Sequence, residues 1–172
     1  MEEQVILIDE NDVQIGLCGK LLAHESGQLH RAISVFIFNQ KNEMLLQRRA
    51  QTKYHSGGLW TNACCSHPRP GESIEKAAQR RLKEEMGIEA DSLFYAFHFI
   101  YKAKLDKGLT EHELDHVFIG KTDEQPKPDP AEVCEYKYLS VEEIKEDLKQ
   151  HPEKYTYWFK RIFEKVISAY FQ

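Results

Sequence analysis

Several histidines and carboxylates in this chain have the types and settings of metal ligands. His24, His30 and His67 lie in or beside apolar segments. Glu111 and Glu113 share one face of an expected strand, because strand side chains alternate. Imidazole and carboxylate together suit Zn²⁺ or Mn²⁺. A lone histidine is more often hydrogen-bonded or at the surface than a metal ligand, so spacing alone leaves both the metal-ligand and the ordinary interpretation open. Five further histidines are expected to be ordinary residues of this kind: His55, His98, His112, His116 and His151.

Two adjacent thiols precede one of these histidines. Cys64 and Cys65 stand in a Cys-Cys-Ser-His sequence at the end of a short apolar segment. Neighbours on a strand point to opposite sides, so one thiol faces the site and the other packs as a small apolar residue. The alternative is a pair of buried, inert thiols. Cys18 and Cys134 are expected to be structural.

A helix is predicted over residues 74–86, from apolar residues at three- and four-residue steps. Ser73 is its expected N-cap, and Gly87 supplies the left-handed end. Glu84 and Glu85 oppose the helix dipole at this end. We therefore expect this acidic pair to be ion-paired or metal-bound.

The remaining pattern predicts a mixed sheet flanked by helices, in a single domain covering residues 1–172. Ser140 and Glu143 form a capping box that opens a second helix to residue 148. A third helix ends near Tyr170, with Trp158 on its apolar face. Alternating, β-branched and aromatic runs predict strands at 4–9, 13–18, 31–38, 44–48, 93–105, 111–120 and 134–139.

Composition limits the function classes. The 172 residues carry a net charge of −5 with no run of Lys or Arg, which disfavours nucleic acid and membrane surfaces as partners. The sequence has no apolar run of membrane length, and its acidic first residues lead us to expect no signal peptide. Four cysteines, two of them adjacent, favour reduced thiols and a cytoplasmic location.

Residues 66–88 resemble the Nudix box. That pattern is Gly, five residues, Glu, seven residues, then Arg-Glu-apolar-x-Glu-Glu-x-Gly-apolar. Its first Glu falls on Glu72, its Arg on Arg80 and its acidic pair on Glu84-Glu85. Ser66 replaces the opening Gly, and Arg81 replaces the Glu after the Arg. The resemblance implies an α+β Nudix-like fold, but a box that exchanges a carboxylate for an arginine should hold fewer cations for hydrolysis.

The Thr-Asn-x-x-Cys-x-His-Pro sequence ending at Pro68, followed by this altered box, is similar to a narrower family, the type 1 isopentenyl-diphosphate delta-isomerases. The resemblance covers nearly the whole chain. It implies one divalent ion, Mn²⁺ or Zn²⁺, bound by three histidines and two glutamates, which fall here on His24, His30, His67, Glu111 and Glu113.

The same resemblance implies roles around a diphosphate substrate. Cys65 and Glu113 match the acid–base pair, assisted by Tyr101, which the turn near Gly108 should place opposite Glu111. Trp158 matches an aromatic residue that faces a carbocation, with core packing as an equal alternative. The diphosphate is expected to contact four basic residues: Lys20, Arg49, Lys53 and Arg81. It is also expected to contact a Mg²⁺ ion held near Glu85. Glu84 and Asp115 are expected to be neighbouring or solvated charges.

The predicted activity is therefore isomerisation of isopentenyl diphosphate to dimethylallyl diphosphate through a carbocation, in isoprenoid precursor biosynthesis. One alternative is a Nudix pyrophosphohydrolase acting on a diphosphate substrate. A second is a non-catalytic module stabilised by a metal on His24, His30 and His67. We expect a small-molecule diphosphate as partner and a monomer or weak homodimer.

Overall fold

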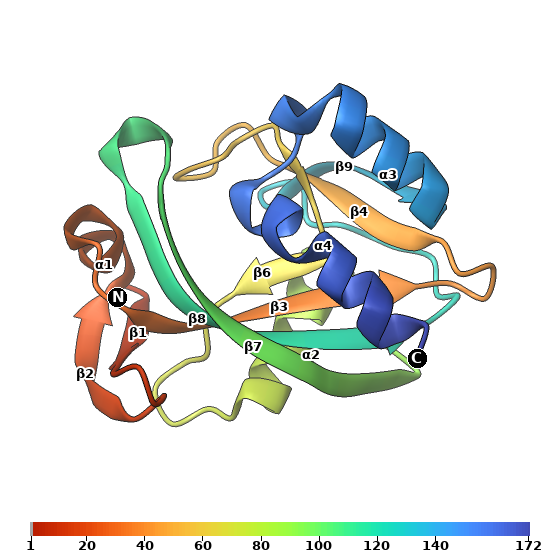
Figure 1. Ribbon diagram of the computed structural model, residues 1–172. Coiled ribbons are helices and arrows are strands. Elements are labelled where there is room, and N and C mark those ends of the chain that lie inside the picture. Colours follow the sequence, from red (N-terminus) through yellow and green to blue (C-terminus); the bar gives the residue numbers. More distant parts are fainter. Residues whose placement is uncertain (1) are drawn as a thin grey trace.

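A computed structural model describes residues 2–172 (Figure 1). The strands of the described chain form one sheet: β1 (Gln4–Ile8), β2 (Gln14–Gly19), β3 (His30–Phe38), β4 (Met44–Arg49), β5 (Trp60–Thr61), β6 (Cys64–Ser66), β7 (Ser92–Lys104), β8 (Thr110–Lys121) and β9 (Val133–Leu139). The helices are α1 (Lys20–Ser26), α2 (Ile74–Met86), α3 (Val141–Gln150) and α4 (Tyr157–Tyr170), with short 3₁₀ turns η1 (Asp106–Gly108) and η2 (Pro152–Lys154). This mixed sheet with helices confirms the predicted α+β class.

Strand β3 organises the sheet. It pairs in parallel with β8 and antiparallel with β1, β4 and β6, while β7 adds to the far side of β8. The alternation of β3 decides the two cores. Ile33, Val35 and Ile37 pack against α2, whereas Phe36 and Phe38 pack with α4 and α3. Helices therefore cover both faces of the sheet, as Figure 1 shows.

Most predicted elements lie within a residue or two of their expected bounds, and the caps agree. Ser73 accepts from the Lys76 backbone N–H, and Gly87 has a left-handed φ of 67°. Ser140 and Glu143 form the predicted capping box. Among residues 2–172, no helix is long and apolar enough to cross a membrane.

Two elements near the site lack a sequence signal. Helix α1 has seven residues, and its N-cap position, Gly19, makes no side-chain hydrogen bond. Strand β5 has two residues. Segments this short show too few turns or alternations for a periodic pattern, and tertiary packing stabilises them instead.

Candidate active site

Two of the predicted metal ligands present the same ring nitrogen to one point. His24 on α1 and His30 at the start of β3 are both fully buried. The Nδ1–H of His24 donates to the Lys20 carbonyl at 2.7 Å, and that of His30 donates to the Gln28 carbonyl at 2.8 Å. Since a carbonyl only accepts, each ring keeps its Nε2 lone pair for the centre of the site.

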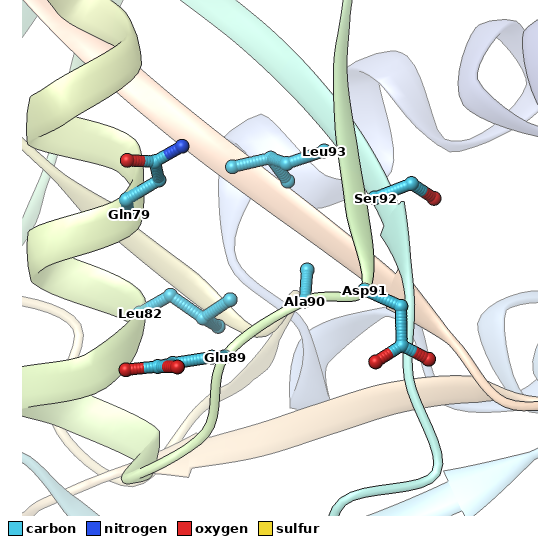
Figure 2. A pocket seen from close by; sticks show the side chains of 7 residues that line it. All are labelled: Gln79, Leu82, Glu89, Ala90, Asp91, Ser92 and Leu93. Carbon is cyan, nitrogen blue, oxygen red and sulfur yellow. The ribbon is translucent and has the colours of Figure 1, made fainter.

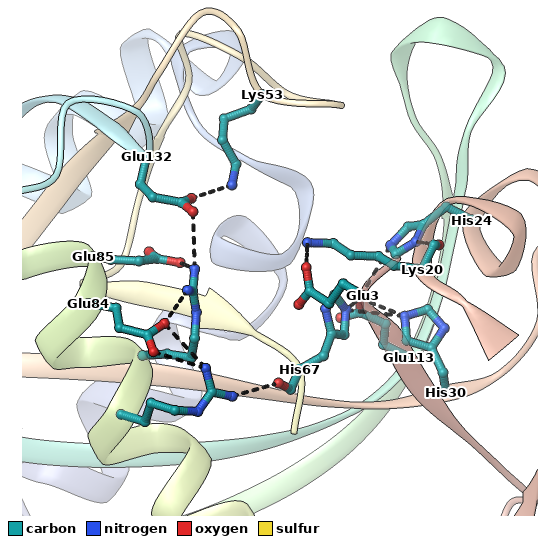
Figure 3. Close-up of polar contacts among 12 residues, drawn as sticks. Glu3, Lys20, His24, His30, Lys53, His67, Glu84, Glu85, Glu113 and Glu132 are labelled. Atoms are coloured by element: carbon teal, nitrogen blue, oxygen red, sulfur yellow. Dashed lines mark hydrogen bonds and ion pairs between the residues drawn. The ribbon is translucent and has the colours of Figure 1, made fainter. Parts of the chain in front are cut away.

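The Glu113 carboxylate lies at that centre (Figure 3). Its Oε1 is 3.0 Å from His67 Nε2, 3.2 Å from His30 Nε2 and 3.8 Å from His24 Nε2. Burial would raise the pKa of Glu113, but the three imidazoles outweigh it and hold that pKa well below its usual range. Burial lowers the pKa of His67 to about 3, so its ring is neutral near pH 7.

This arrangement fits a divalent cation. One ligand atom each from His24, His30, His67 and Glu113 lies within 4.8 Å of the others, and all four residues are buried. The Nε2 of His24 is buried and makes no hydrogen bond. Imidazoles and an ionised carboxylate that converge on one point match the donors that Zn²⁺ and Mn²⁺ take.

Glu111 lies beside this group and brings in a histidine that the sequence did not single out. His55 Nε2 is 2.9 Å from Glu111 Oε2, and His24, His55 and Glu111 form a second converging set that shares His24. His55 is buried among the site residues, so of its two expected settings it has the hydrogen-bonded one and not the surface one. It follows a loop with no periodic pattern, so no sequence signal marked it.

Tyr101 links the two glutamates. Its hydroxyl contacts both Glu111 and Glu113, at 3.0 Å from Glu113 Oε2. The expected register is wrong by one alternation, because Tyr101 pairs with Glu113 and Ala103 pairs with Glu111. The hairpin is centred on Lys107, one residue later than the expected pairing requires. The tyrosine stays on the correct face because its partner changes by two residues.

Of the two thiols, Cys65 faces the site and Cys64 packs in the core against α2. Cys65 Sγ donates to Asn62 Oδ1 at 3.2 Å and lies 3.4 Å from Ser34 Oγ. Burial, followed by the nearby Asp115, raises the pKa of the Cys65 thiol, so the thiol form predominates at neutral pH.

Of the two settings expected for Asp115, solvated or neighbouring the site, the structure shows the second, since the residue is only 1 % exposed. Its Oδ2 accepts from Ser34 Oγ at 2.6 Å, beside Cys65. Burial raises the pKa of Asp115 well above its usual range, with the Glu113 charge adding to the effect. Ser34 and Asp115 therefore belong to the thiol's surroundings; Ser34 was missed because it lies within a uniformly buried strand.

The thiol and the central glutamate line one small cavity of about 20 Å³, together with Trp158 and other residues of the site: Tyr54, His55, Ser66, His67 and Glu111. Such a volume holds about one water molecule. Trp158 is 2 % exposed and lies under the Arg49 guanidinium, 5.4 Å from the ring centroid. Any substrate larger than water must widen this cavity.

The four predicted diphosphate contacts already have partners. Lys20 pairs with Glu3 at 3.1 Å, and Lys53 pairs with Glu132 at 2.5 Å. Arg81 contacts Glu84, Glu85 and Glu132, at 2.6, 2.7 and 3.3 Å respectively. Arg49 donates to the His55 carbonyl at 3.0 Å. The expected ion pairing of the acidic residues of α2 is thus present. Glu132 bonds both Lys53 and Arg81, and Figure 3 shows its contact with Lys53.

Tyr54 brings two of these cations together. Its ring centroid lies 4.6 Å from Lys20 Nζ and 5.7 Å from Lys53 Nζ. Tyr54 and Glu132 were missed in the sequence because both lie in irregular loops.

Comparison with known proteins shows which family this chain resembles. Residues 28–159 match the NUDIX domain family model. The chain is 50% identical over 169 residues to "Isopentenyl-diphosphate Delta-isomerase 2" of Aromatoleum aromaticum, covering 98% of this chain and 89% of that protein. It is 50% identical over 163 residues to the protein of the same activity name from Pectobacterium atrosepticum, covering 95% and 90%.

The chain belongs to the Nudix superfamily and, within it, to the isopentenyl-diphosphate delta-isomerase family.

Solved structures share the fold of this isomerase-family chain at lower identity. A Deinococcus radiodurans protein, DR0079, superposes with a TM-score of 0.70 at 19% identity, covering 87% of this chain and 90% of that one. The MutT protein of Methanosarcina mazei gives 0.66 at 24% identity, covering 80% and 91%. At these identities the likeness concerns the fold alone.

A larger groove lies away from the candidate site of this family member. It has a volume of about 420 Å³ between α2 and the start of β7 (Figure 2). Gln79, Glu89 and Asp91 supply its polar groups. None of the residues implied by the isomerase resemblance lines it, and its carboxylates are unsuited to an anionic substrate.

Proposed function

We propose that the chain isomerises isopentenyl diphosphate to dimethylallyl diphosphate, an isoprenoid precursor. The observation that carries the proposal is the buried cavity lined by Cys65, Glu113 and Trp158. The names of relatives at about 50% identity over nearly the whole chain support it.

The reaction moves a double bond, so one group must give a proton and another must take one. The acid protonates the terminal alkene carbon, which leaves a tertiary carbocation, and the base removes a proton from the carbon on the other side. We assign these roles to Cys65 and Glu113, which are held in place by Asn62 and Tyr101. Trp158 presents an aromatic face to the cation, an attraction of ~2 kcal/mol or more when water is excluded. The reaction is reversible, so each residue serves as acid in one direction.

His24, His30, His67 and Glu113 would hold a divalent ion such as Zn²⁺ or Mn²⁺, with Glu111 as a further ligand beside them. When bound, this ion supplies positive charge that fixes the Glu113 carboxylate. A Mg²⁺ ion with the substrate would lie near Glu85, whose Oε2 accepts from Gln47 at 2.9 Å.

On this proposal, substrate binding replaces the carboxylate partners of the basic side chains with phosphate oxygens. The diphosphate replaces Glu3 on Lys20 and Glu132 on Lys53 and Arg81, while Arg49 keeps its place above Trp158. Guanidinium and ammonium groups suit phosphate oxygens. On this proposal the exchange loosens the contacts of these segments, and the cavity widens to admit the hydrocarbon part of the substrate.

The hydrolase alternative is less well supported. Arg81 stands where the Nudix box has a carboxylate, and it bonds Glu84 and Glu85, the remaining acidic pair. The non-catalytic alternative does not explain why Cys65 and Trp158 line the same cavity.

The test is turnover in deuterated water with Mg²⁺, followed by NMR. Deuterium-labelled dimethylallyl diphosphate without phosphate release is expected from the wild type, and a loss of ~10²–10⁴-fold is expected from Cys65→Ala or Glu113→Gln. Phosphate release without alkene migration would move the assignment to a hydrolase. Full isomerase activity in both variants would overturn the acid–base assignment.

A further inference from the structure

The face of the β7–β8 ribbon opposite the catalytic glutamates carries a second histidine cluster. His98 and His116 are direct cross-strand partners, with ring centroids 5.7 Å apart. The Tyr95 hydroxyl is 2.9 Å from His98 Nδ1 and 3.1 Å from His116 Nδ1. Because His116 alternates with Asp115, this cluster lies on the other side of the strand from the active site. Two imidazole nitrogens therefore converge on one spot that the isomerase mechanism does not use.

An irregularity in β7 builds this convergence. Tyr95 and His98 are three positions apart, and on a regular strand they would face opposite sides. The β7–β8 register shifts between Tyr95 and Phe97, where one extra residue places Tyr95 on the face of His98. Bulges of this kind re-aim a side chain, and they are frequent beside functional sites.

A carboxylate fixes one of the two rings. His116 Nε2 donates to Asp12 Oδ2 at 2.9 Å, so the neutral ring carries its proton on Nε2 and keeps the lone pair on Nδ1. Arg31 holds Asp12 in turn, at 2.6 Å from Oδ1 and 2.8 Å from the backbone oxygen. A carboxylate behind an imidazole is the arrangement that orients metal-binding histidines.

We propose that His98 and His116 form a second divalent-metal site, with both Nδ1 atoms as ligands and Asp12 as the orienting carboxylate. The ion is of the nitrogen-preferring class, Cu²⁺, Ni²⁺ or Zn²⁺. Since a metal–nitrogen bond is about 2.0–2.1 Å, the ion takes the position between the rings and the Tyr95 phenol turns aside. Tyr95 is 42 % exposed and His98 is exposed, so the phenol has room to move and water completes the coordination.

The test compares Ni²⁺ stoichiometry in matched variants of the full chain. Metal-free protein is equilibrated with Ni²⁺ by dialysis, and bound metal is measured by mass spectrometry. His98→Ala is expected to bind one equivalent fewer than the wild type. The control is His151→Ala, another exposed histidine beside a carboxylate, Glu153, which is expected to bind the wild-type amount. The difference between variants separates this site from the buried cluster of His24, His30 and His67.

Two further measurements identify the ligands. Asp12→Asn should still bind the extra equivalent of metal, but with an affinity about 10–100-fold lower, which is the usual effect of losing an orienting carboxylate. With Cu²⁺, the electron paramagnetic resonance spectrum of the wild type should contain one nitrogen-coupled component that His98→Ala lacks, while the component from the buried histidine cluster remains in both. The turnover of His98→Ala stays at the wild-type level. Equal Ni²⁺ stoichiometry in His98→Ala and the wild type would overturn the proposal, as would an equal loss in His151→Ala.

Discussion

At the scale of single residues, the thiol's environment is defined by one amide. Asn62 is fully buried, and its Nδ2 donates to the Val35 and Cys64 carbonyls at 3.0 and 2.9 Å. Those bonds leave Asn62 Oδ1 free to accept from Cys65 Sγ and from Thr61 Oγ1. Thr61 Oγ1 in turn accepts from Thr156 Oγ1 at 2.9 Å. The N-terminus of α4 is thereby connected to the candidate catalytic thiol through three polar side chains.

Thr61 offers a matched test of this connection. Thr61→Val keeps the shape but removes the hydroxyl, so Asn62 Oδ1 loses a donor and the thiol loses its fixed direction. We expect kcat to fall ~10-fold with KM unchanged, and stability to fall by ~1–3 kcal/mol. Thr61→Ser keeps the hydroxyl and should restore kcat. Equal kcat in the Val and Ser variants would contradict the positioning role.

At the scale of elements, the end of α2 illustrates how backbone conformation fixes a site-bearing helix. Gly87 has φ 67°, and a Cβ at this position would lie 2.4 Å from the Lys127 carbonyl oxygen. Helix α2 carries Arg81 and Glu85, so this close packing also sets their position relative to the loop that holds Glu132.

Gly87→Ala should therefore destabilise the protein more than a left-handed backbone alone explains. The backbone cost is ~1–2 kcal/mol, and the steric clash adds to it. Gly71→Ala is the control, because Gly71 has φ 77° but a Cβ added there would meet nothing within 4 Å. Urea unfolding measures the stability of both variants relative to the wild type. If the two variants lost equal stability, the contact with Lys127 would have no energetic weight.

The start of α2 predicts a pH dependence. Arg80 hydrogen bonds hold the pKa of Glu72 below its usual value, and burial opposes the shift only in part. A lowered folded-state pKa means that the Glu72 charge stabilises the fold above about pH 4.5 and that this contribution is lost as pH falls through the folded pKa. Glu72→Gln should be less stable by ~1–3 kcal/mol at pH 7. Chemical unfolding between pH 7 and 3 should show that the difference in unfolding free energy between the wild type and Glu72→Gln becomes smaller as the pH falls. A difference that stays constant would contradict the stabilising role of the Glu72 charge.

At the scale of the whole molecule, a segment ahead of the first strand contacts the candidate site. Glu3, which precedes β1, bonds Lys20 at the start of α1 at 3.1 Å. On the proposed function the diphosphate must break this ion pair, so the free protein holds one of the proposed substrate-binding groups in an internal contact.

Glu3→Gln should therefore lower KM for the diphosphate substrate. The pair is partly exposed, with 52% of the Glu3 side chain accessible, and such pairs contribute ~0.2–1 kcal/mol, so the fall in KM should reach at most about fivefold. The effect should diminish as salt is added. Glu2→Gln is the charge-matched control, with KM expected at the wild-type value. An unchanged KM in Glu3→Gln would show that the pair does not compete with substrate.

The sequence by itself determined what repeats or has a local signal. Periodicity predicted α2, α4 and the long strands, the capping residues predicted helix ends, and the Thr-Asn-x-x-Cys-x-His-Pro sequence with its altered box indicated the family. These features are local, because propensity, alternation and caps act over a few residues.

Only the tertiary structure decided which of those residues meet. Strand register placed Glu113 rather than Glu111 at the centre of the histidines, and it buried Asp115 beside the thiol. Irregular loops delivered His55 and Glu132, and a bulge turned Tyr95 toward His98. Contacts across dozens of residues depend on register and loop path, and a one-residue change in register reverses the face of every side chain.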